Sequence, residues 1–66
     1  MAELDFIDKQ IMRYLFLYPG WHTSNQVADG VGISWITASM HLEGLGRMGY
    51  VAKGERGLKT YWKANE

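Results

Sequence analysis

The chain has 66 residues, with seven basic and seven acidic side chains, no cysteine and a formal net charge of zero. This length allows a single domain over residues 1–66, and a hydrophobic content of 47% excludes a disordered tail. Without cysteine, the chain has no disulfide framework, no thiolate metal site and no cysteine nucleophile.

The first predicted element is a helix over residues 5–18. Asp5 is suited to cap its N-terminus, because a carboxylate there accepts a hydrogen bond from a free backbone N–H of the first turn. Pro19 ends the helix, since proline disfavours helical dihedrals in the residue before it. Apolar side chains recur at helical spacing on the side that we expect to face the core: Leu4, Ile7, Ile11, Tyr14, Leu15 and Tyr18.

The same helix carries a second apolar line, opposite the expected core face. Phe6 and Leu17 lie on this line, and Met12 and Phe16 flank it. A monomer of 66 residues cannot cover both faces of its first helix, so the line predicts a homodimer surface. The alternative is that these side chains extend the monomer core.

Two further helices and a β-hairpin follow. Thr23 begins a capping box and predicts a helix over about 24–30, and Ser34 caps a helix over about 35–48. Two β-rich segments, residues 50–53 and 58–63, flank a glycine-containing turn at 54–57 and predict a hairpin over about 50–63.

The segment from residue 23 to residue 51 combines small, apolar and turn residues at a distinctive spacing. Its members are Thr23, Val27-Ala28, Val31-Gly32-Ile33-Ser34, Ala38, Leu42, Leu45 and Gly49-Tyr50-Val51. This pattern resembles the winged helix-turn-helix domains of prokaryotic transcription regulators, broadly of the MarR, ArsR and PadR type. The resemblance covers about residues 5–64 and implies an α+β fold, with three helices followed by a two-stranded β-hairpin wing. Minimal domains of this kind are common in archaea, viruses and plasmids, so the resemblance also implies an origin of that sort.

In such domains the third helix enters the major groove of double-stranded DNA. Carried over by position, the candidate recognition residues are Ser34, Trp35, Ile36, Thr37, Ser39, Met40 and Arg47. Family members place several Arg, Lys, Asn or Gln side chains there, because these read base edges. Here much of the face is apolar, and Glu43 adds a negative charge. We therefore keep open a second function, a protein-interaction module that uses Trp35, Ile36 and Met40.

The wing carries the other candidate DNA contacts. We expect Arg56 at the tip, and Lys53 and Lys59 on the arms, to contact backbone phosphates. The alternative is a solvated edge hairpin whose lysines prevent edge-to-edge aggregation. The first half of the chain has two basic and four acidic residues and the second half has five and three, so the basic excess lies on the wing side.

Single aromatic residues and histidines have structural interpretations. We expect Trp62 to pack the hairpin onto the helices, and Trp21 to cover the end of the first helix within an extended link. His22 and His41 have no spacing typical of a metal site, and His41 is expected to be partly buried.

No nucleophile with its base and no phosphate-binding glycine loop is present, so we predict no enzyme activity, cofactor or metal. No apolar run has the length of a membrane span and no signal peptide is visible, so we expect a cytoplasmic protein.

Overall fold

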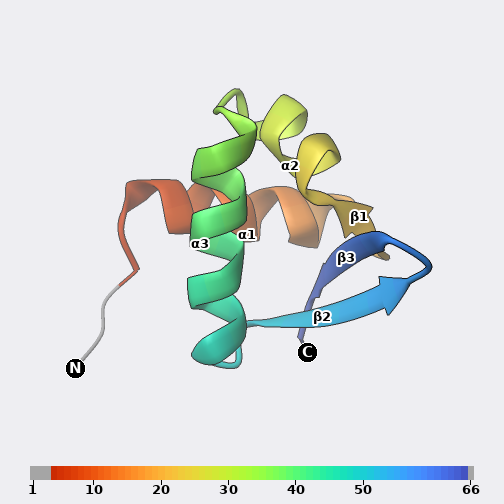
Figure 1. Ribbon diagram of the computed structural model, residues 1–66. Helices are drawn as coiled ribbons and strands as arrows, with labels where there is room; N and C mark the ends of the chain where they lie inside the picture. Colours follow the sequence, from red (N-terminus) through yellow and green to blue (C-terminus); the bar gives the residue numbers. More distant parts are fainter. Residues whose placement is uncertain (1–3, 66) are drawn as a thin grey trace.

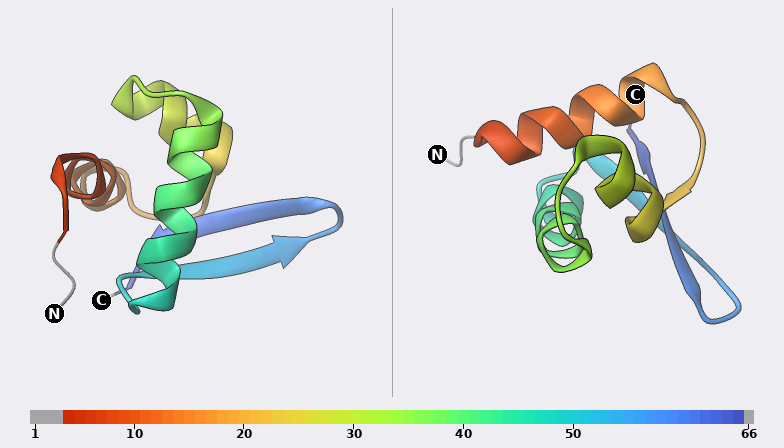
Figure 2. Two further views of the ribbon diagram at one scale, coloured as in Figure 1. Left: turned by 60° about the vertical axis from the view of Figure 1, so that its left-hand side comes forward. Right: turned by 90° about the horizontal axis from the view of Figure 1, so that it is seen from above.

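The computed structural model describes residues 4–65, which form three helices and three strands. In chain order these are α1 (Phe6–Leu17), β1 (His22–Thr23), α2 (Ser24–Val31), α3 (Trp35–Arg47), β2 (Val51–Arg56) and β3 (Lys59–Ala64). Helix α1 runs behind α3 and across it, and the β2–β3 hairpin projects away from the helices (Figure 1, Figure 2). Each predicted helix is present, with ends within one residue of those expected.

Side chains adjacent to the helices fix where they begin. The Asp5 carboxylate accepts from the Asp8 backbone N–H at 2.8 Å, and the Asp8 carboxylate accepts from the Asp5 backbone N–H at 3.2 Å. Thr23 makes the same reciprocal arrangement with Gln26 at the start of α2. Ser34 accepts from Thr37 N–H at 3.1 Å and begins α3. These caps satisfy backbone donors that a helix cannot pair within itself.

The sheet has three strands in the order β1-β3-β2, all antiparallel, instead of the two strands that the sequence predicted. The added strand is the link between α1 and α2, where His22 pairs with Trp62 and Thr23 with Tyr61. A strand of two residues is too short to show an alternating pattern, so the sequence indicated only an extended link. Its pairing ties the hairpin to the start of α2.

The hairpin turn lies at Gly57-Leu58, and the expected turn at 54–57 is wrong. Gly54 is a strand residue paired with Tyr61, and Arg56 pairs with Lys59 at the end of the strands. Gly57 has φ +63°, and no residue other than glycine has a positive φ among residues 4–65. A glycine with positive φ at the first of two turn residues is typical of a type II′ hairpin.

The core lies between the three helices and the base of the sheet. It is formed by buried side chains from all of them: Ile11, Met12, Leu15, Val27, Leu42, Leu45, Val51 and Trp62. Trp62 confirms the sequence expectation, with only 2% of its surface exposed and its Nε1 donating to Ser24 Oγ at 3.1 Å. Gly46 of α3 lies beside this ring, and a Cβ there would be in ordinary contact with it at 3.5 Å.

Helix α1 corrects two sequence assignments. Met12 is buried in the core, so its place on the predicted dimer surface is wrong, whereas Tyr18 is exposed and does not belong to the core. Met12 follows Ile11 on the flank of the buried stripe, where a flexible side chain can turn inward. Phe6, Phe16 and Leu17 remain exposed. None of the helices within residues 4–65 is long and apolar enough to cross a membrane.

Candidate nucleic-acid interface

A groove separates α3 from the β2–β3 hairpin, with the start of α2 at one end. It is a hollow of about 500 Å³ lined by side chains from all three regions: Thr23, Ser24, Asn25, Trp35, Ser39, Glu43, Leu58, Lys59, Thr60 and Trp62. Of the residues predicted to contact DNA, the structure brings Trp35, Ser39 and Lys59 together here.

The other predicted recognition residues lie elsewhere on α3. Ile36 and Met40 are 62% and 69% exposed, and Trp35 is 54% exposed, so three large apolar side chains face solvent on one helix. Arg47 is exposed in the last turn of α3. The Ser34 hydroxyl donates to Thr37 Oγ1 at 2.9 Å while it caps the helix, so its hydrogen-bonding capacity is used within the protein.

The three predicted wing cations do not share one face of the hairpin. Lys53 lies opposite Trp62 in the register, on the face toward the helices, and its Nζ is 3.1 Å from Glu43 Oε2. The same ammonium group lies 5.5 Å from the centre of the Trp62 ring. Glu43 therefore has a partner on β2, which explains an acidic residue on the outward side of α3.

Arg56 and Lys59 face each other across the last pair of the hairpin, on the side away from the helices. Both are exposed, and neither is in an ion pair among the described residues. Lys59 also lines the groove beside α3 because it stands next to the turn. These two side chains are free to meet a phosphate.

Sequence reasoning missed Asn25 and Leu58. Asn25 is the second residue of α2 and lines the groove, and Leu58 is fully exposed in the turn. The capping box at Thr23 was a usable signal for Asn25, since it fixes which residues stand at the start of α2. Leu58 was missed because it was expected in a strand, whereas it lies in the hairpin turn.

One cluster of acidic and imidazole groups lies outside the groove, where α1 meets α3. His41 Nδ1 is 2.7 Å from Asp8 Oδ1 and 3.7 Å from Asp5 Oδ1, so three potential metal ligands lie together. The carboxylates already accept the hydrogen bonds of the α1 capping box, and His41 donates to Asp8. His41 is partly buried, as the sequence indicated.

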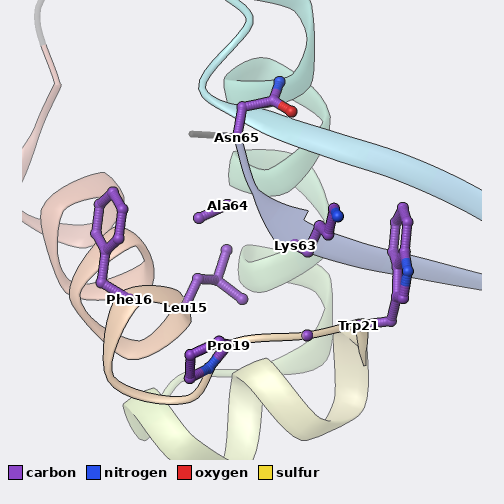
Figure 3. A pocket seen from close by; sticks show the side chains of 8 residues that line it. Leu15, Phe16, Pro19, Trp21, Lys63, Ala64 and Asn65 are labelled. Carbon is purple, nitrogen blue, oxygen red and sulfur yellow. The ribbon is translucent and has the colours of Figure 1, made fainter.

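A second hollow, of about 440 Å³, opens at the other end of α1 (Figure 3). Phe16 and Pro19 border it on one side, and Lys63, Ala64 and Asn65 border it on the other. Trp21 also lines it, but its ring packs over Gly54 of β2, so it covers the hairpin more than the end of α1. This hollow continues the exposed apolar surface of α1.

No protein-family model and no curated protein matches the sequence. Solved structures do match. PcaV, a transcriptional regulator from Streptomyces coelicolor, superposes with a TM-score of 0.87 at 20% identity over 98% of this chain. The fold is the winged helix. A possible transcriptional regulator from Methanosarcina mazei Go1 matches at 0.86 with 13% identity over 96% of the chain, and ZitR from Lactococcus lactis, solved in complex with DNA, matches at 0.82 with 16% identity over 100%.

This winged helix spans about half the length of the regulators that it matches. It covers 57% of the Methanosarcina protein, 48% of PcaV and 46% of ZitR. TM-scores of 0.82–0.87 show that the backbones share one fold. At identities of 13–20%, most side chains differ from those of the matched proteins, so the chemistry of α3 and the wing depends on the residues of this chain.

Proposed function

We propose that the protein is a DNA-binding transcription regulator that acts in the cytoplasm. The observation that carries this proposal is the groove between α3 and the wing, with an exposed α3 face on one side and Lys59 of the wing tip, in no ion pair among residues 4–65, on the other. Helix α3 lies in the major groove and the wing follows the phosphate backbone. The winged-helix fold and the solved complex of ZitR with DNA support this assignment.

The contacts that we propose fall into two kinds. Thr37, Ser39 and Arg47 reach base edges or nearby phosphates, and Trp35, Ile36 and Met40 contact thymine methyl groups and sugars. Arg56 and Lys59 contact phosphates. Lys53 contributes less, because Glu43 already offsets its charge.

Titration of the wild-type protein with random duplex DNA at about 50 mM and about 200 mM salt tests the proposal. Phosphate contacts predict binding that weakens as salt rises, because neutralised phosphates release counterions. A protein that leaves duplex DNA free at the lower salt concentration does not have this function.

The second candidate function is a protein-interaction module. The exposed apolar triplet Trp35, Ile36 and Met40, beside the neutralised Glu43–Lys53 pair, favours it. The variant Trp35→Ala separates the two functions. If it keeps duplex affinity while Thr37→Ala and Ser39→Ala also leave sequence preference unchanged, α3 does not read DNA.

We further propose a homodimer through the exposed line on α1, formed by Phe6 and Leu17 and flanked by Phe16. The line runs along the 12 residues of α1, about 18 Å, with Arg13 exposed near its middle. A two-fold pair presents two α3 helices to successive turns of DNA. This arrangement compensates for the few base-reading side chains on each α3.

A further inference from the structure

The wing has an outer face turned away from the helices, and the proposed duplex contacts reach it only at the tip, through Arg56 and Lys59. Strand alternation and the β2–β3 register place six residues on it: Ala52, Gly54, Arg56, Lys59, Tyr61 and Lys63. Three of these six are cationic and none is acidic. The opposite face of the same strands carries Glu55, Thr60 and the paired Lys53. The positive charge of the hairpin is therefore concentrated on the side away from the helices.

Trp21 covers the base of this outer face. Its six-membered ring packs on the backbone of Gly54, where a Cβ atom would lie only 3.0 Å from the ring. Lys63 Nζ lies 5.2 Å from the centre of the same indole. The ring is thus held by the sheet and yet 48% exposed, which leaves aromatic surface open to a ligand.

A hollow of about 370 Å³ lies beside this ring, lined by Trp21, Gly54, Glu55, Arg56 and Tyr61. Alternation turns the Glu55 side chain to the other face, so Glu55 contributes backbone here. The remaining side chains are an indole, a phenol and a guanidinium. The volume is at the small end of ligand pockets and suits one planar ring.

We propose that the outer face of the wing binds single-stranded nucleic acid, with one base stacked on Trp21 and the phosphates held by Arg56, Lys59 and Lys63. Aromatic platforms beside a line of cations are what sequence-independent single-strand binding requires. Lys59 and Lys63 are separated by about 13 Å of strand, which suits several phosphates of a chain better than those of one free nucleotide. This activity shares Arg56 and Lys59 with the proposed duplex contacts and adds Trp21 and Lys63, which those contacts do not use.

The test measures binding of a labelled oligothymidylate of about 12 nucleotides by fluorescence anisotropy, at low salt. Trp21→Ala removes the stacking surface and is expected to weaken binding by at least about fivefold. Gly54→Val fills the floor of the hollow and displaces the ring while favouring a strand, so it is expected to weaken binding similarly. Tyr50→Ala is the matched control and is expected to keep oligothymidylate binding, since it removes an aromatic side chain of similar exposure outside both proposed binding surfaces.

The same variants are titrated with duplex DNA in parallel, so that failure of the single-strand site is distinguished from failure of duplex binding. Loss of oligothymidylate binding in Trp21→Ala and Gly54→Val, with duplex binding retained, supports the proposal. Wild-type oligothymidylate affinity in a folded Gly54→Val or Trp21→Ala protein overturns it. Thymidine monophosphate that competes as tightly as the oligonucleotide overturns the assignment to a strand and indicates a nucleotide site.

Discussion

At the residue scale, Asp8 joins the first and third helices through one carboxylate. It is buried, it accepts from His41 of α3, and it completes the capping box of its own helix. We expect Asp8→Ala to lower the free energy of unfolding by about 1–3 kcal/mol, because it removes a cap and leaves His41 without its acceptor.

Urea unfolding followed by circular dichroism measures this loss. Asp29→Ala is the control, since Asp29 is an exposed acidic residue of α2, and its effect is expected to stay within about 0.5 kcal/mol. Equal stability of the two variants would show that the link between Asp8 and His41 contributes nothing.

The three wing cations, Arg56, Lys59 and Lys53, are predicted to differ in how much each contributes to duplex binding. Arg56→Ala and Lys59→Ala should each weaken binding to all duplex sequences alike and lower the logarithmic salt slope by roughly one unit. Lys53→Ala should change the slope less, because its ammonium group is 3.1 Å from Glu43. Titrations at several salt concentrations give the slopes, and a slope change as large for Lys53→Ala as for Arg56→Ala would contradict this division of roles.

At the scale of the element, the helical glycines have unequal surroundings. Nothing lies within 4 Å of a Cβ built on Gly44, whereas a Cβ on Gly30 would collide with the Tyr14 ring. Gly44→Ala should therefore raise the free energy of unfolding by about 0.5–1 kcal/mol through helix propensity. Gly30→Ala should lower it, although both replace glycine by alanine within a helix. Thermal and urea unfolding of the pair decides the matter, and a destabilised Gly44→Ala would require a role for that glycine outside the monomer fold.

The helices could be predicted from the sequence because their ends depend on local side chains. Asp5, Thr23 and Ser34 each cap a helix where their position in the sequence indicated. The strand at 22–23 could not be predicted, since its partner strand β3 lies about 40 residues along the chain. The misplaced hairpin turn has a similar cause: Gly54 is typical of a turn by composition, and the ring that covers it comes from Trp21, far away in sequence.

In the candidate site, too, the positions of residues along the chain could be predicted, and contacts between distant elements could not. The resemblance to winged helices placed Trp35 and Ser39 on the correct helix and Lys59 on the wing, and the structure brings all three to one groove. The ion pair between Lys53 of β2 and Glu43 of α3 could not be predicted, because hydrophobic periodicity does not indicate which charged side chains of two elements meet.

At the scale of the whole molecule, the exposed line on α1 predicts a dimer. Each large side chain buried between subunits contributes roughly 1.5–3 kcal/mol before the costs of association. Phe6, Phe16 and Leu17 on each subunit are therefore enough for association at micromolar concentrations. Sedimentation equilibrium should find a dimer for the wild type and a monomer for the double variant Phe6→Glu, Leu17→Glu.

The control for this experiment is the double variant Ile36→Glu, Met40→Glu, which places the same charges on the other exposed apolar face. It is expected to remain dimeric. A wild type that is monomeric at high concentration, or a control that dissociates equally, would assign the exposed line on α1 no part in assembly.

The buried position of Trp62 has a consequence for how the molecule folds. The largest side chain of the core is supplied by the last strand, and the β1–β3 pairs join residues 38 and 40 positions apart. The three helices precede Trp62 in the chain, so their core is incomplete until β3 pairs with β1. The entropy of closing this long loop is lost before the contacts of Trp62 stabilise the fold. On the ribosome, the domain is expected to gain protease resistance only after residue 62 has left the exit tunnel, so its folding is a late, single event.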